Sequence, residues 1–136
     1  MKAALVERFR SAFGAEPTVI ARAPGRIEFI GNHTDYNGGT VLGAAIDRGI
    51  WVAARATSEA KATFVSGHSA TKVEVALDGS LSKQTGDRAW VNYQLGVWAK
   101  MPYFGLKRPA GFQFADVSDL PPGAGLSSSA AIELAT

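Results

Sequence analysis

A glycine-rich segment near the end of the chain has the residue types that bind phosphate. It reads PGAGLSSSAA from Pro122 to Ala131. Its two glycines allow positive φ angles and a close approach of the backbone to a ligand. The free N–H groups at the start of a following helix attract anions. The three serine hydroxyls could bind phosphate oxygens or Mg²⁺, which prefers oxygen ligands. The segment lacks both the Walker A and the G-x-G-x-x-G pattern, and the alternative is a plain turn with a serine helix cap.

A second polar stretch, from Ala23 to Gly39, could bind a polyol. It holds one arginine, two carboxylates, one histidine, two asparagines and four glycines. The planar guanidinium of Arg26 suits phosphate or a sugar hydroxyl, and His33 and Asp35 could hydrogen-bond hydroxyls from a loop. The alternatives are a salt-bridged surface arginine, an Asx-type turn, and a simple hairpin turn at Asn37-Gly38.

Composition excludes several classes of function. The chain has 136 residues, 46% of them hydrophobic, and no cysteine, which is enough for one compact domain and rules out a disulfide scaffold or a cysteine nucleophile. The net charge of +2 is small, and the basic residues form no stripe that could bind nucleic acid. We find no apolar run that would span a membrane and no signal peptide. These features predict a cytoplasmic protein that binds neither nucleic acid nor membrane.

The elements that must position these stretches follow from hydrophobic periodicity. A helix is predicted over 2–13, closed by Gly14, and a second over 89–101, stopped by Pro102. A third helix is expected from 126 onward. It has no capping residue before Thr136, so we expect the chain to stop inside this element. Strands are predicted at 18–20, 26–30, 40–42, 50–54, 63–65 and 72–75, with another near 111–115.

Taken together, these patterns resemble the galactokinase branch of the GHMP small-molecule kinases. The first stretch is similar to the family's N-terminal signature at Gly25-Arg26, Ile30-Gly31, 33–37 and Gly39. The segment from Pro122 to Ala131 resembles its ATP phosphate loop, and 90–97 resembles the helix between them. The resemblance implies an α+β fold of the ribosomal protein S5 domain 2-like type, with a mixed, mostly antiparallel sheet from about 17 to 75. It also implies that 1–136 is the N-terminal GHMP domain, incomplete at its C-terminal end and without the second domain.

The resemblance further implies transfer of the γ-phosphoryl group of Mg·ATP to the anomeric hydroxyl of galactose or a related sugar, in galactose metabolism. Arg26 would be catalytic, beside the transferred phosphate. The implied sugar-binding residues are Asn32, His33, Asp35 and Tyr36. The implied ATP-binding residues are Trp90, Tyr93, Pro122, Gly123, Ala124, Gly125, Leu126, Ser127, Ser128 and Ser129, with Ser129 also a ligand of Mg²⁺. For Trp90 and Tyr93, core packing is the alternative, because they share a helical stripe with Val97.

Two departures from the family pattern limit this interpretation. The family has asparagine at the position of Glu28 and an acid at that of Asn32, whereas this chain has the reverse. An N-acetylated hexosamine, a pentose or a uronic acid are therefore alternatives to galactose. No residue matches the family's catalytic aspartate or its further Mg²⁺ ligand, so 1–136 alone is predicted to be inactive. A regulator that binds sugar and ATP without catalysis is the alternative function, and the absence of an insert in the phosphate loop favours the enzyme.

Overall fold

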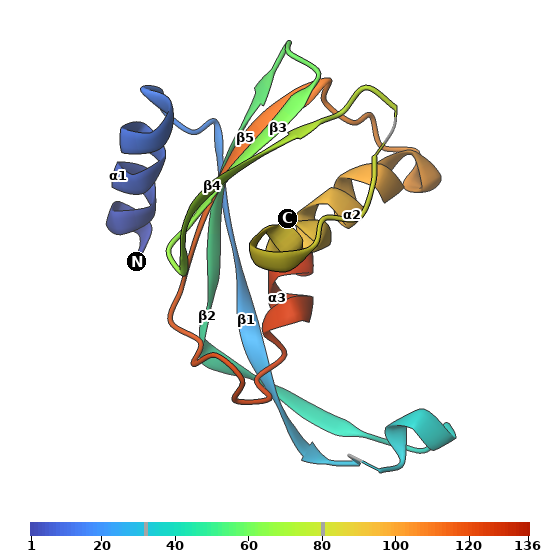
Figure 1. Ribbon diagram of the computed structural model, residues 1–136. Helices are drawn as coiled ribbons and strands as arrows, with labels where there is room; N and C mark the ends of the chain where they lie inside the picture. Colours follow the sequence, from blue (N-terminus) through green and yellow to red (C-terminus); the bar gives the residue numbers. More distant parts are fainter. Residues whose placement is uncertain (32, 80) are drawn as a thin grey trace.

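The computed structural model describes residues 1–31, 33–79 and 81–136. It contains one five-stranded sheet in the order β1-β2-β5-β3-β4 (Figure 1). The strands are β1 (Val19–Ile30), β2 (Leu42–Thr57), β3 (Lys61–Ser66), β4 (Ser69–Ala76) and β5 (Gly111–Ser118). The α-helices are α1 (Lys2–Phe13), α2 (Asn92–Lys100) and α3 (Ser128–Ala135). Three short 3₁₀ helices complete the set: η1 (Asp35–Asn37), η2 (Gly86–Val91) and η3 (Met101–Phe104).

The pairing of the strands confirms the α+β class with a mixed, mostly antiparallel sheet. The pairs β1–β2, β2–β5 and β3–β4 are antiparallel, and β3–β5 is parallel. The prediction that the sheet spans only about 17–75 is wrong, because β5 enters between β2 and β3 and joins the two antiparallel parts. This position matters for the site, since β5 leads directly into the glycine-rich segment.

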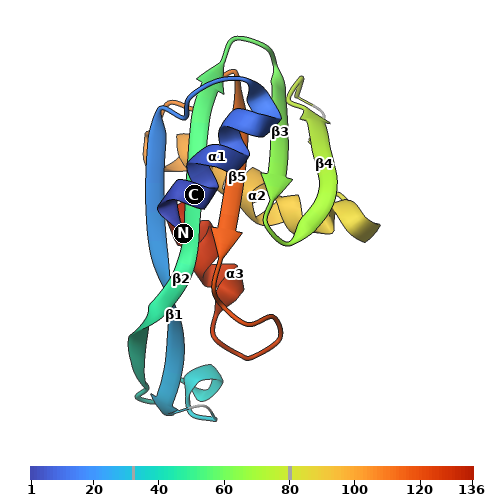
Figure 2. The same ribbon diagram turned by 90° about the vertical axis from the view of Figure 1, so that its left-hand side faces the viewer.

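Helices cover both faces of the sheet, α1 on one and α2 with α3 on the other (Figure 2). On the first face, Leu5 and Phe9 of α1 are fully buried against Ala53, Ala115 and Val117. On the second face, α2 and α3 pack on the phenylalanines at 64, 112 and 114. The alternation of side chains along each strand explains how one sheet serves two cores.

Four predicted strands and one predicted helix have different bounds in the structure. The strands at 18–20 and 26–30 are one strand, β1, and those at 40–42 and 50–54 fall largely in β2. A register shift between Pro24 and Arg26 accommodates the proline, which has no N–H to donate to the ladder. The helix predicted over 89–101 is α2 with 3₁₀ turns at both ends, and Pro102 lies in the first turn of η3, where a missing N–H costs nothing.

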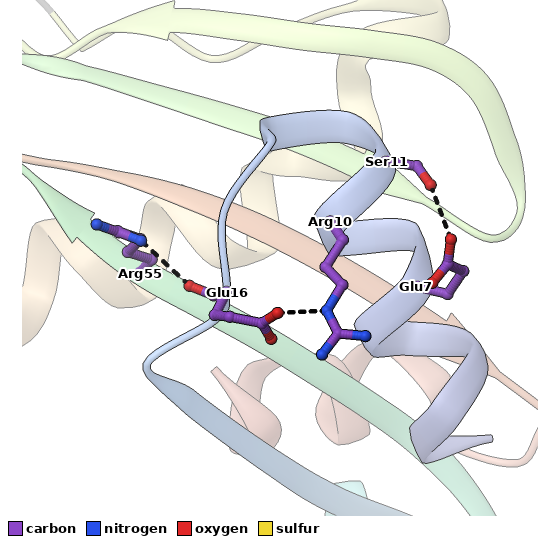
Figure 3. A network of polar contacts seen from close by, with 5 residues as sticks. All are labelled: Glu7, Arg10, Ser11, Glu16 and Arg55. Atoms are coloured by element: carbon purple, nitrogen blue, oxygen red, sulfur yellow. Dashed lines mark hydrogen bonds and ion pairs between the residues drawn. The ribbon is translucent and has the colours of Figure 1, made fainter.

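Polar contacts between α1, β2 and the segment that joins α1 to β1 add little to the packing of α1 on the sheet (Figure 3). Arg10 forms an ion pair with Glu16, and Nη1 of Arg55 donates a hydrogen bond to the backbone oxygen of Glu16 at 3.4 Å. Both members of the ion pair are more than half exposed, so the pair contributes little stability. The buried Leu5 and Phe9 therefore hold the helix.

Among the described helices, none is long and apolar enough to cross a membrane.

Candidate functional site

The glycine-rich segment forms a loop in which every second residue has left-handed backbone geometry. The φ angles of Gly123, Gly125 and Ser127 are 69°, 68° and 59°. Ser127 is the one residue other than glycine with a positive φ in the part of the chain that the structure describes. Successive turns of this kind direct backbone N–H groups toward a common anion. Ser127 also precedes α3, but no side-chain capping hydrogen bond is found there among the described residues, which argues against the simple serine cap.

Strand β1 holds this loop in place and brings Arg26 beside it. The N–H of Arg26 donates a hydrogen bond to the backbone oxygen of Leu126 at 3.1 Å. A side chain at Gly25 would collide with the loop, because its Cβ would lie 3.0 Å from that same oxygen. Nη2 of Arg26 lies 3.6 Å from Oε2 of Glu28. The structure therefore places the backbone of Arg26 next to the predicted phosphate loop, whereas its guanidinium lies beside Glu28 and is not among the described residues that line the cavity beside the loop.

A cavity of about 610 Å³ opens beside the loop, on the face of the sheet covered by α2 and α3. Pro122, Ser128 and Ser129 line it from the loop, and Trp90 and Tyr93 line it from η2 and α2. The hydroxyl of Ser129 donates a hydrogen bond to that of Tyr93 at 3.1 Å. Trp90 also packs edge-on against Phe64, so it belongs both to the core and to the cavity wall. The volume is in the usual range for small-molecule sites.

The sequence interpretation missed the polar end of this cavity, at Asp116 of β5. Asp116 is 6% exposed and accepts a hydrogen bond at its Oδ2 from the hydroxyl of Ser66, at 2.9 Å. Its other oxygen, Oδ1, has no hydrogen-bond partner among the described residues. Burial raises the pKa of Asp116 to about 6, although the Ser66 hydrogen bond and the charges of His68 and Arg8 act in the opposite direction. Strand alternation contained the signal, since Asp116 continues the inward-facing series of Phe112 and Phe114.

The described members of the predicted sugar-binding set, His33, Asp35 and Tyr36, lie elsewhere, between β1 and β2 at the end of the arm that these strands form (Figure 1). Nδ1 of His33 and the hydroxyl of Tyr36 are 2.9 Å apart, and the amide of Asn37 donates to the backbone oxygen of His33 at 2.9 Å. Asp35 begins η1, which Gly38 ends, so this turn is longer than a two-residue hairpin. The described lining of the loop cavity includes none of these side chains. Asn32 lies outside the described residues.

Ser129, the predicted ligand of Mg²⁺, would have a single hydroxyl oxygen to offer the ion. Residues 1–31, 33–79 and 81–136 contain no group of three or more histidine, aspartate or glutamate side chains that could hold a metal ion. A single hydroxyl fits Mg²⁺, which usually keeps several waters and takes further oxygens from nucleotide phosphates. Because the Ser129 hydroxyl donates its hydrogen to Tyr93, the lone pairs of its oxygen would remain available to the ion.

Comparisons with known proteins show what this chain is similar to. A family model described as the galactokinase galactose-binding signature matches residues 7–56. The galactokinase of Roseiflexus sp. is 41% identical over 96% of this chain and 32% of its own length, and that of Staphylococcus carnosus is 37% identical over 98% and 34%. The structure of Lactococcus lactis galactokinase complexed with galactose superimposes with a TM-score of 0.84 at 35% identity, over 98% of this chain and 34% of that one. The mevalonate kinase of Methanococcus jannaschii, at 20% identity and a TM-score of 0.72, shares the fold.

The sheet, its helices and these structural relatives define a domain of the GHMP kinase class. Within that class, the chain corresponds to the N-terminal portion of the galactokinases. It spans about a third of the length of the curated relatives that it matches.

Proposed function

We propose that this chain forms the nucleotide-binding part of a sugar 1-kinase, which transfers the γ-phosphoryl group of ATP to the anomeric hydroxyl of galactose or a related sugar. The observation that carries the proposal is the series of left-handed residues at 123, 125 and 127, held by β1 next to Arg26. Backbone N–H groups presented in this way suit a polyphosphate.

Each part of the site has a distinct role in this proposal. The loop amides bind the triphosphate, and the fixed positive charge of Arg26 stabilises the negative charge that develops during phosphoryl transfer. The ion pair with Glu28 orients the guanidinium. His33, Asp35 and Tyr36 bind sugar hydroxyls, and Trp90 and Tyr93 flank the base. Mg²⁺, held partly by Ser129, would supply charge neutralisation on the phosphates.

Residues 1–136 alone are expected to bind nucleotide without turning it over. The matched relatives are about three times longer, and no carboxylate of this chain matches the family's catalytic aspartate. The test incubates the purified chain with Mg·ATP and galactose and measures sugar 1-phosphate against a reaction without protein. Product above that background would contradict the expectation. Calorimetry with Mg·ATP on the same sample tests the proposal itself, which fails if no binding is found.

A double substitution of the loop glycines should weaken nucleotide binding. Alanine in left-handed geometry costs about 1–2 kcal/mol per residue, so the variant with Gly123→Ala and Gly125→Ala leaves this geometry or strains it. We expect its affinity for Mg·ATP, measured by calorimetry, to fall at least about tenfold. Gly105→Ala is the matched control, because Gly105 has a φ of 71° and open space at its Cβ position among the described residues, yet lies at the end of η3. Equal ATP affinity in the double variant and the control would contradict a role of the left-handed loop residues in phosphate binding.

A further inference from the structure

The unpaired oxygen of Asp116 is a feature of the cavity that the proposed function leaves unexplained; the Nε1 of Trp90 is likewise buried without a partner among the described residues. A buried carboxylate oxygen without a hydrogen-bond donor is costly, because burial removes the water that would otherwise solvate it. Asp116 is 94% buried, lines the cavity, and has no partner for Oδ1 among the described residues. Such a group is suited to accept a hydrogen bond from a ligand.

The hydrogen bond from Ser66 leaves one oxygen of Asp116 without a donor. The backbone N–H of His68 donates to Oγ of Ser66 at 3.1 Å, and the Ser66 hydroxyl in turn donates to Oδ2 of Asp116 at 2.9 Å. The backbone of the same turn is fixed to β5 as well, since the N–H of Gly67 donates to the backbone oxygen of Asp116 at 2.8 Å. Oδ2 therefore already has a donor, and Oδ1 is the oxygen left without one among the described residues.

The same cavity connects this acceptor to the phosphate loop. Its lining runs from Asp116 through Ser118 and Leu120 of the β5 end to Pro122, and then to Ser128 and Ser129. The aromatic rings of Trp90 and Tyr93 lie along the same wall. A nucleotide with its phosphates at the loop would extend its base along the aromatic wall toward Asp116.

We propose that Asp116 selects the nucleobase by accepting a hydrogen bond from the exocyclic amino group of a 6-aminopurine. The proposal rests on the proposed function and goes further by assigning the specificity of the nucleotide. A 6-oxo group would instead bring an acceptor up to the carboxylate, and an ionised carboxylate can only accept. The adjacent pair of donors on a 2-amino-6-oxopurine would need both oxygens, and Ser66 already occupies one.

Three nucleotides that differ at position 6 of the purine test this assignment. They are the magnesium complexes of ATP, of purine riboside triphosphate, which has hydrogen there, and of inosine triphosphate, which has oxygen. Calorimetry on the wild-type chain should give an affinity for ATP about tenfold to a hundredfold above that for purine riboside triphosphate, as expected for a hydrogen bond to a charged group. Inosine triphosphate bound in the same pose would point its 6-oxo group, and not its N1–H, at the carboxylate, so it should bind no better than purine riboside triphosphate.

Asp116→Asn should reverse this preference. The asparagine oxygen must face the Ser66 hydroxyl, so its amide NH₂ takes the place of the free oxygen and favours a 6-oxopurine. We expect the variant to bind inosine triphosphate at least as tightly as ATP. The matched control is Asp47→Asn, which removes the same charge from an exposed residue outside the cavity and should keep the preference for ATP.

The outcomes separate the two proposals. If the wild-type chain binds all three nucleotides equally well, or if Asp116→Asn keeps the wild-type order of affinities, the assignment of Asp116 is overturned and nucleotide binding at the loop stands. If none of the three nucleotides binds, both the assignment and the proposed function are overturned.

Discussion

Replacing Asp116 with asparagine is expected to stabilise the fold by up to about 3 kcal/mol at pH 8. Burial raises the pKa of this carboxyl from 3.8 to about 6, and each unit of such a shift corresponds to about 1.4 kcal/mol. At pH 8 the wild-type chain must keep a charged carboxylate in the interior, whereas asparagine is neutral at every pH. The substitution keeps an acceptor for the Ser66 hydroxyl, so the existing hydrogen bond is preserved.

The pH dependence gives this prediction its sign. An acid whose pKa is raised by folding binds its proton more tightly in the native state. Below about pH 4, Asp116 is protonated in both states, and its burial carries no charge penalty. As the pH rises from about 4 through about 6, the native state must give up a proton that it binds more tightly than the unfolded state, so the free energy of unfolding falls. The gain from Asp116→Asn should be absent at pH 4, grow between pH 4 and 6, and level off above pH 7.

Urea unfolding of both chains at several pH values measures this difference. The free energy of unfolding of the variant minus that of the wild type should follow the curve just described. Asp47→Asn is again the control, and at an exposed position it should change stability by less than about 0.5 kcal/mol at any pH. A difference for Asp116→Asn that does not vary with pH would contradict the burial of an ionised carboxylate.

Local sequence patterns were sufficient to predict the helices and the loop. The spacing of Leu5 and Phe9, with Gly14 behind them, predicted α1 with its observed bounds, because a helix of this length is specified by its own apolar stripe and its cap. The glycines of the loop predicted positive φ angles, and both adopt them. These features depend on residues that are neighbours in the chain.

Features that depend on distant pairing could not be predicted in the same way. Strand β5 was expected, but its place between β2 and β3 follows from partners about fifty residues away, which periodicity does not specify. The role of Asp116 depends on that placement, because Ser66 meets it only when β3 and β5 are paired in parallel. The available clue was that Asp116 is a charged residue between hydrophobic neighbours. This clue indicates a buried polar group, but it does not predict that Ser66 is the hydrogen-bond partner.

The spatial relation between the two motifs was likewise beyond the sequence. The contact of Arg26 with Leu126 joins residues a hundred positions apart, and neither the spacing nor the family resemblance predicted it; the resemblance implied only that Arg26 lies near the transferred phosphate. The resemblance also assigned His33 and Asp35 to the sugar. The structure places them on the arm (Figure 1). They are not in the described lining of the loop cavity, so the described residues do not join the two predicted binding regions in one cavity. Their role in sugar binding stays a prediction.

Replacing Gly25 with valine should displace the phosphate loop from β1. A Cβ at this position would lie 2.5 Å from Cδ2 of Leu120 and 3.0 Å from the backbone oxygen of Leu126. Leu120 is 4% exposed, so its side chain has little room to move, and the two further methyl groups of valine increase the overlap. The loop must then shift, which breaks the hydrogen bond from the N–H of Arg26 to Leu126 and separates the arginine from the loop.

We expect two measurable consequences of Gly25→Val. The free energy of unfolding should fall by about 1–3 kcal/mol, the usual cost of overpacking, and the affinity for Mg·ATP should fall at least about tenfold because the loop amides lose their support. Gly96→Val is the matched control, since a Cβ there would meet no described atom within 4 Å and Gly96 lies on α2, outside the loop cavity. Calorimetry at a temperature where both variants are folded separates binding from stability. If Gly25→Val and the control bind ATP equally well, the packing of β1 against the loop does not determine the nucleotide site, because the loop would then hold its phosphate-binding geometry without that strand.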